Sequence, residues 1–169
     1  MQNKTILVVV LLLSLGLAYL WQQGQKTVEI STQIDIAATP EQVWQVLSDI
    51  DAWAQWSPII NQSEGVAVKD SILTITMVGG EPSLDGPMYQ PKIIELEAPR
   101  YLRWSAVMTT SIFLVNDKVL ELQPMSNGTR LIHKELFRGM FVPIFSGRFK
   151  ENVPPMLNAM NQALKSKVE

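Results

Sequence analysis

Cysteine is absent from the 169 residues, and His133 is the single histidine. Without cysteine the chain can form no disulfide, no thiolate metal site and no thiol nucleophile. A metal site would have to be built from carboxylates, but the acidic residues are scattered and no loop has the spacing of oxygen ligands. We therefore expect neither a metal nor another cofactor.

Runs of lysine and arginine are also missing, and the net charge is −2. A chain of this kind has no basic patch to attract a phosphate backbone, so no nucleic-acid partner is expected. The sequence contains no G-x-S-x-G motif, no P-loop and no dinucleotide fingerprint. Their absence disfavours hydrolase chemistry that uses a nucleophile.

A long apolar segment opens the chain. Thr5–Trp21 contains no charge and would form a helix of about 25 Å, slightly shorter than a bilayer core of about 30 Å. A cleaved signal peptide is the alternative, but it requires a small-x-small cleavage site, and the residues that close this segment make a poor one. Tyr19 and Trp21 instead suit an aromatic anchor at the membrane interface. We predict an uncleaved membrane anchor.

The apolar segment sets the predicted domain boundaries. Residues 1–22 form the single-pass anchor, 23–27 a linker, and 28–169 one domain of ordinary size. Lys4 precedes the anchor, whereas acidic residues accompany Lys26 after it. This distribution favours a cytoplasmic N-terminus with the domain on the exported side.

The domain begins with a strand and two short helices. Val28–Ile36 alternates and contains several β-branched residues, which predicts a strand. Thr39 is a suitable N-cap for a helix that starts at Pro40. A second short helix is expected after Asp49 and should end before Pro58.

Strands joined by turns occupy the middle of the domain. The connector 79–87 is long enough to be a flap, and the other separators are short, which predicts an antiparallel meander. Six runs have strand character, namely 59–68, 71–78, 89–97, 101–108, 112–123 and 129–137.

A long C-terminal helix is expected to close the domain. Apolar residues recur three or four positions apart from Phe145 to Leu164, as on one face of a helix. Pro154 and Pro155 interrupt this stripe. They predict either a kink or a new helix capped by Asn152.

Several phrases resemble the START/polyketide-cyclase (SRPBCC) superfamily, and the resemblance covers about residues 28–169. The phrases, in chain order, are IDIAATPEQVW (34–44), DIDAWAQWSP (49–58), LEAPRYLRW (96–104), GTR (128–130) and AMNQALK (159–165). The resemblance implies an α+β helix-grip fold, in which a curved antiparallel sheet of about seven strands wraps a long C-terminal helix and two short helices follow the first strand. It also implies a hydrophobic cavity between sheet and helix. Because members include lipid carriers, hormone receptors and cyclases, the phrases specify shape rather than reaction.

Aromatic and methionine side chains supply the candidates for the cavity wall. Trp44, Trp104 and Met160 are interpreted as core residues, and Arg103 as a solvated residue rather than a cap on a ligand. The cavity candidates are Trp53, Trp56, Met108, Phe113, Met140, Phe141, Phe145, Phe149 and Met156.

His133 and Glu135 are the candidates for catalysis. On a regular strand they share a face with Leu131 and Phe137, and this face is expected to point inward. They could act as a general acid/base pair in which the carboxylate raises the pKa of the imidazole. The alternative is a buried pair that only satisfies its own hydrogen bonds.

The leading hypothesis is a membrane-tethered module that binds a lipid or another hydrophobic small molecule in its cavity, for storage or for transport, and this role requires no covalent step. A cyclase or dehydratase that uses His133 and Glu135 is the second hypothesis. A protein-interaction or stress-related module is the third, and an interior completely filled by side chains would favour it. No oligomeric state is predicted.

Overall fold

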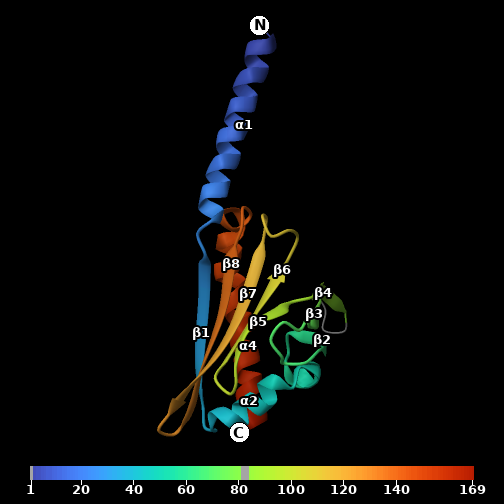
Figure 1. Ribbon diagram of the computed structural model, residues 1–169, viewed down its shortest axis with the longest axis vertical. Helices are drawn as coiled ribbons and strands as arrows, with labels where there is room; N and C mark the ends of the chain where they lie inside the picture. Colours follow the sequence, from blue (N-terminus) through green and yellow to red (C-terminus); the bar gives the residue numbers. More distant parts are fainter. Residues whose placement is uncertain (1, 81–83) are drawn as a thin grey trace.

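A computed structural model describes residues 2–80 and 84–169. It confirms the predicted α+β fold, with an N-terminal helix, antiparallel sheets and a long C-terminal helix (Figure 1). The elements are α1 (Gln2–Gly24), β1 (Val28–Ile36), α2 (Pro40–Ser48), the 3-10 turn η1 (Ile50–Ala52), α3 (Trp53–Trp56), β2 (Ile60–Glu64), β3 (Thr74–Val78), β4 (Asp85–Tyr89), β5 (Lys92–Glu97), β6 (Tyr101–Val107), β7 (Val115–Met125), β8 (Gly128–Arg138) and α4 (Val142–Val168).

The strands form a five-stranded sheet, ordered β1-β8-β7-β6-β5, and a three-stranded sheet, ordered β2-β3-β4. The sequence predicted about seven strands. The additional strand is β4, which overlaps the end of the predicted flap 79–87. Residues 81–83 of this flap lie outside the described residues. The predicted run 89–97 divides before Pro91, which has no N–H to donate to a ladder. Backbone bonds of 2.9 Å from Leu73 N to Pro91 O and from Ile93 N to Ser71 O join the two sheets.

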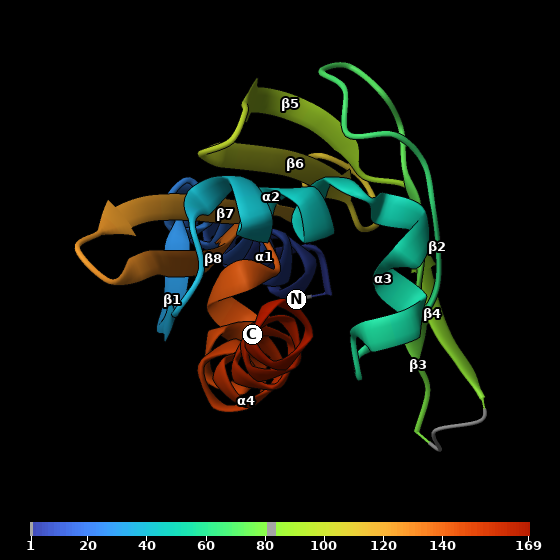
Figure 2. The ribbon, with the colours of Figure 1, turned by 90° about the horizontal axis from the view of Figure 1, so that it is seen from below.

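The sheets curve around α4, and α2 and α3 cover one end of the resulting groove (Figure 2). Thr39 caps α2 as predicted, because its hydroxyl accepts a hydrogen bond from Gln42 N while the Gln42 side chain accepts one from Thr39 N. The main core lies between the sheets and these helices. Trp53, fully buried, packs there against Trp104 with ring centroids 5.2 Å apart.

Helix α4 continues without interruption through Pro154 and Pro155, so no new helix begins after Asn152. Each proline removes the hydrogen bond to the carbonyl four residues earlier, at Lys150 and Glu151. Both of those residues are exposed, so water can satisfy the two carbonyls. Because the two carbonyls that lack a helical partner lie on the exposed side, one helix accommodates both prolines.

Helix α1 projects from one end of the domain (Figure 1). An 18-residue window within Lys4–Gly24 has a mean hydropathy of 2.1, and none of that window is buried, as in a membrane span or a signal sequence. The helix extends to Gly24, so only residues 25–27 separate it from β1. Gly139 N donates a 3.0 Å hydrogen bond to Gly24 O, and a Cβ on Gly24 would lie 2.7 Å from the Gly139 backbone. This contact fixes the end of α1 against the domain.

Candidate functional site

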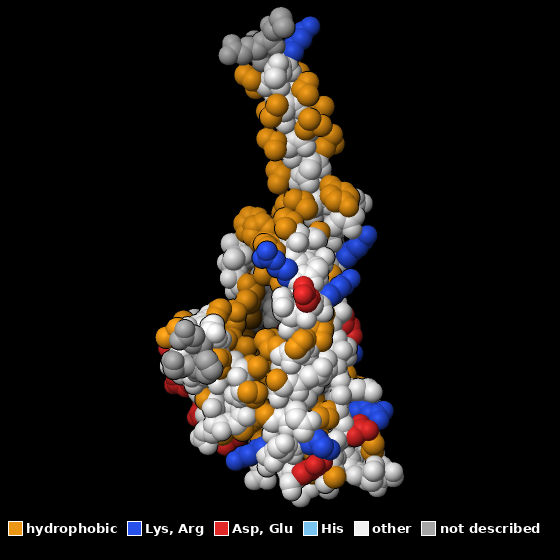
Figure 3. All heavy atoms as spheres, turned by 180° about the vertical axis from the view of Figure 1, so that it is seen from behind, with side chains coloured by type: hydrophobic (Ala, Val, Ile, Leu, Met, Phe, Trp, Pro, Cys, Tyr) orange, Lys and Arg blue, Asp and Glu red, His pale blue; other side chains and the backbone are white. Residues whose placement is uncertain are grey.

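A cavity of about 230 Å³ lies between the sheets and α4. Figure 3 shows a hollow flanked by hydrophobic side chains, in the half of the domain nearer α1. Most of the cavity wall is apolar and includes Ile60, Ile75, Met77, Trp104, Ala106 and Met160. Four polar residues also line it, namely Tyr89, Asn116, Lys118 and Glu135. The site is therefore an apolar void with one group of polar side chains.

Three of the predicted cavity residues line this void, namely Met108, Phe149 and Met156. Trp104 and Met160 also line it, although the sequence analysis assigned both to the core. Both are almost fully buried, so they contribute to core and cavity together.

The other predicted cavity residues lie elsewhere. Trp53 is buried in the core, and Trp56 packs against that core from a partly buried position. The remaining four gather where β7 and α4 begin, at the end of the domain that carries α1, and they are Phe113, Met140, Phe141 and Phe145. Sequence spacing could not separate these three environments, because aromatic residues suit all of them.

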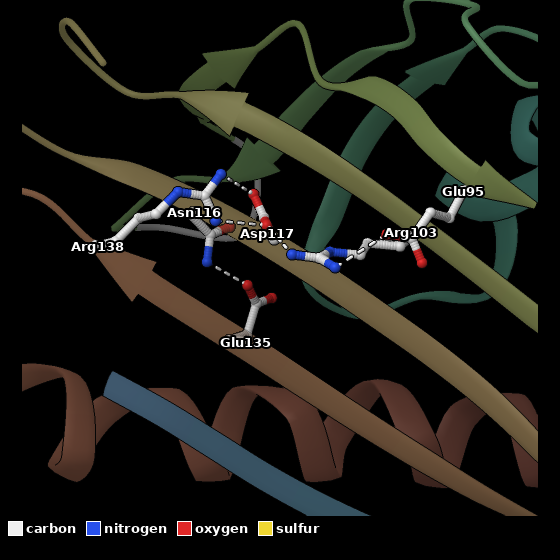
Figure 4. A network of polar contacts seen from close by, with 6 residues as sticks. All are labelled: Glu95, Arg103, Asn116, Asp117, Glu135 and Arg138. Atoms are coloured by element: carbon white, nitrogen blue, oxygen red, sulfur yellow. Dashed lines mark hydrogen bonds and ion pairs between the residues drawn. The ribbon is translucent and has the colours of Figure 1, made fainter. Parts of the chain in front are cut away.

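Lys118 forms the centre of the polar group. Its Nζ lies 2.5 Å from Glu135 Oε1 and 2.9 Å from His133 Nε2. Asn116 Nδ2 donates to the other oxygen of Glu135 (Figure 4). Lys118 and Glu135 are both more than nine-tenths buried, so each compensates the charge of the other in a region that excludes water.

His133 lies behind Lys118, away from the cavity wall, and is fully buried. Its Nδ1 is 2.7 Å from Asn161 Oδ1, and Asn161 Nδ2 donates to Thr32 Oγ1 over 2.9 Å. These contacts fit a neutral ring that donates from Nδ1 and accepts from the Lys118 ammonium at Nε2. Burial first, and then the charge of Lys118, hold the pKa of His133 well below 6.5.

The predicted acid/base geometry is therefore corrected. His133 and Glu135 face inward together, but Lys118 lies between them and bonds to both. No described contact lets Glu135 orient the ring, and the pKa of His133 is lowered rather than raised. The charged groups that reach the cavity are Lys118 and Glu135. The sequence offered one signal for Lys118, since it alternates with Leu120 and Leu122 along one face of β7.

Tyr89, on β4, adds a hydroxyl to the cavity wall. Burial, with a smaller contribution from the charge of Glu135, raises the pKa of this phenol above its ordinary value. The phenol therefore stays protonated at neutral pH and is able to donate a hydrogen bond.

A second charged cluster occupies the opposite face of the five-stranded sheet (Figure 4). Asp117 Oδ2 lies 2.7 Å from both Arg103 and Arg138, and Arg103 also bonds to Glu95. Burial opposes ionisation of Asp117, but hydrogen bonds from Arg138, Ser105 and Arg103 outweigh it and lower its pKa. Arg103 belongs to this outer cluster and does not reach the cavity.

The curved sheets, the long C-terminal helix and the cavity between them define a helix-grip domain. The chain belongs to the family described as polyketide cyclase / dehydrase and lipid transport, whose model matches residues 27–169. This match confirms the predicted resemblance to the START/polyketide-cyclase superfamily. A search of curated protein sequences found no match.

Solved structures share the fold. A START superfamily protein from Mycobacterium smegmatis has a TM-score of 0.66 at 18% identity, over 83% of this chain and 96% of its own. Norcoclaurine synthase from Thalictrum flavum, in complex with dopamine and hydroxybenzaldehyde, has a TM-score of 0.67 at 18% identity, over 88% and 90%. An aromatase/cyclase from a Streptomyces species has a TM-score of 0.65 at 15% identity, over 85% and 94%. At these identities the likeness concerns the fold alone.

Proposed function

We propose that this protein binds an apolar small molecule in its cavity while α1 tethers it to a membrane. The observation that carries the proposal is the largely apolar void between the sheets and α4, which has a polar group at one position on its wall. A ligand that buried about 200 Å² of apolar surface there would gain about 5 kcal/mol from desolvation. Binding requires no covalent step.

The size of the cavity limits the ligand. Its 230 Å³ exceeds the roughly 150 Å³ that accommodates benzene in an engineered cavity, but is below the roughly 300 Å³ at which drug-sized pockets begin. One or two rings, or a single short acyl chain, fit this volume. A whole two-chain lipid does not.

The polar group adds a chemical preference. Lys118 has three N–H donors, of which the described contacts use two, with Glu135 and His133. The third donor and the Tyr89 hydroxyl can bind a carbonyl or hydroxyl oxygen. Because Glu135 already neutralises Lys118, a neutral oxygen suits the site better than a carboxylate. The favoured ligand is an apolar molecule with one such oxygen.

Native mass spectrometry of the full chain purified from its natural host, together with solvent extraction, tests this function. We expect a bound apolar molecule at one per chain. Ala106→Phe should abolish ligand binding, because Ala106 lines the cavity and the phenyl ring would occupy its space. Ala159→Phe is the matched control, since Ala159 is exposed on α4 and does not line the cavity. An empty protein that also ignores a panel of apolar probes would refute the binding function.

An enzyme of the cyclase or dehydratase type is the second candidate. The specific observation is the Lys118–Glu135 ion pair on the cavity wall, which could supply an acid and a base to a bound carbonyl compound. Lys118→Met and Glu135→Gln should then abolish turnover of aromatic polyketide-like substrates while binding persists. His133→Gln should reduce turnover less, because the ring contacts Lys118 and not the cavity. Equal turnover by all the variants would exclude this chemistry.

The interaction or stress-related module has less support. It would have been favoured by an interior filled with side chains, whereas the structure has a cavity.

A further inference from the structure

Four large apolar side chains are exposed at the end of the domain that carries α1. Exposed fractions are 58% for Val107, 50% for Ile112, 37% for Phe113 and 57% for Ile144. Val107, Ile112 and Phe113 belong to the end of β6 and its connection to β7, and Ile144 to the first turn of α4. We call these four residues the proximal patch.

The backbone holds the proximal patch beside the end of α1. Met140 N donates to Ile112 O and Phe141 N to Phe113 O, each over 3.0 Å, so the β6–β7 and β8–α4 connections form one unit. Gly139, in the same unit, bonds to Gly24 at the end of α1. Figure 1 shows both connections at the end of the domain from which α1 leaves.

A continuous row of aromatic rings links the proximal patch to the cavity. Phe113 stacks on Phe141 with centroids 4.8 Å apart, and Phe141 meets Phe145 at 6.2 Å. Phe145 lies 6.3 Å from Phe149, which stacks on Phe137 at 4.2 Å. Phe149 and Phe137 both line the cavity. An apolar surface thus extends from the proximal patch to the cavity wall.

We propose that the proximal patch inserts into the surface of the bilayer that α1 spans, and that the cavity exchanges its apolar ligand directly with this leaflet along the row of phenylalanines. The ligand exchange rests on the proposed function, since it requires α1 as an anchor and a cavity that holds a ligand.

The position of α1 favours a bilayer as the occupant of the patch. The 21 residues of Lys4–Gly24 give a helix of about 31 Å, enough to cross a hydrocarbon core. Tyr19 and Trp21 lie near the end that joins the domain, where aromatic side chains mark the membrane interface. A domain fixed to that end presents the proximal patch to the same interface. Exposed aliphatic and aromatic side chains gain free energy there.

Fluorescence quenching by membrane lipids tests whether the proximal patch inserts. Because the natural chain has no cysteine, single cysteines at Ile112 and Ile144 can each carry an environment-sensitive fluorophore on the full chain in phosphatidylcholine vesicles. We expect blue-shifted emission and several-fold stronger quenching by lipids brominated on their acyl chains than at the control Ile72. Ile72 is 64% exposed but lies in the connection between β2 and β3. Quenching at Ile112 and Ile144 no stronger than at Ile72 would overturn the proposal.

The exchange is tested by the double variant Ile112→Asp/Ile144→Asp. Two charges in place of two inserted side chains should slow the loading of a fluorescent apolar probe from vesicles about tenfold. Equilibrium occupancy should remain unchanged, because neither residue lines the cavity. Unchanged loading would refute the direct exchange. A chain that inserts the patch but holds no probe at equilibrium would refute the cavity function and leave the insertion standing.

Discussion

Asp117 and Lys118 are neighbours on β7, and their side chains belong to two different charged clusters on opposite faces of one sheet. Asp117 is completely buried, but the Arg103 and Arg138 side chains that bind it are 25% and 40% exposed. Lys118 and Glu135 are 9% and 4% exposed and border a cavity. The outer cluster connects a buried charge to water, whereas the inner cluster keeps both charges away from bulk solvent. That difference separates a structural cluster from a candidate ligand site.

Lys118→Met should break the inner cluster most strongly. The change leaves Glu135 buried without its counter-ion and His133 Nε2 without a donor. Removal of one partner from a buried pair typically costs about 3 kcal/mol or more, so we expect a loss of that order in the free energy of unfolding. Denaturant unfolding of the full chain in mild detergent, followed by tryptophan fluorescence, measures it.

Lys92→Met is the matched control for that loss. Lys92 pairs with Asp70 at 2.7 Å, but both side chains are at least half exposed. Exposed pairs contribute at most about 1 kcal/mol, so Lys92→Met should be nearly neutral. Equal losses in the two variants would mean that the inner pair is not isolated from water.

Asp117→Asn should break the outer cluster at a lower cost. The two arginines lose a carboxylate, but both retain contact with water, and Arg103 keeps Glu95. We expect a loss of about 1 to 2 kcal/mol in the free energy of unfolding and no change in bound ligand, since none of these residues lines the cavity. A loss larger than that of Lys118→Met would reverse the comparison.

The sequence predicted which face of the sheet a side chain occupies better than it predicted which side chains contact each other. Alternation along β8 placed His133 and Glu135 inside with Leu131 and Phe137, as the structure has them. Lys118 was missed because its partners lie on the next strand, β8, and alternation within one strand does not show which residues of two paired strands face each other. The sequence also could not tell which apolar candidates line the cavity, since the same residue types build core, cavity wall and exposed surface.

Local signals were more reliable than long-range ones. Thr39 and Pro40 correctly marked the start of α2, because capping depends only on neighbours in the chain. The continuity of α4 through Pro154 and Pro155 depended instead on which carbonyls were exposed. Exposure is a property of the assembled domain, so no spacing rule could supply it.

The two clusters should also respond to acid in different pH ranges. The pKa of His133 is lowered on folding, so the unfolded chain binds the proton first and stability falls as the pH drops below 6.5. Between pH 6.5 and 5.5 this contribution amounts to about 1 kcal/mol, and His133→Gln should lack it. Asp117, whose pKa is lowered, loses its contribution only below about pH 4. Unfolding experiments at both pH values, on wild type and variant, measure the difference.

NMR provides an independent check, because His133 is the only histidine. Its ring resonances should not titrate between pH 8 and pH 6, a range in which an ordinary imidazole is partly protonated. A midpoint near 6.5 would place the ring in contact with water and remove the distinction between the clusters.

The double variant Lys118→Met/Glu135→Met should lower stability less than Lys118→Met alone, and its effect on the ligand is the most informative. Replacement of both buried charges by apolar side chains of similar size removes the desolvation cost together with the attraction, so most of the stability lost in Lys118→Met should be recovered. The remaining loss reflects the partners that His133 Nε2 and Asn116 Nδ2 no longer have. Stability would then no longer depend on the pair, while the cavity would lose its two charged side chains. If the ligand carries an oxygen that Lys118 binds, its affinity should fall although the fold is intact. Unchanged affinity for the natural ligand would mean that the apolar wall alone selects it, and that the inner cluster, like the outer one, serves only the sheet.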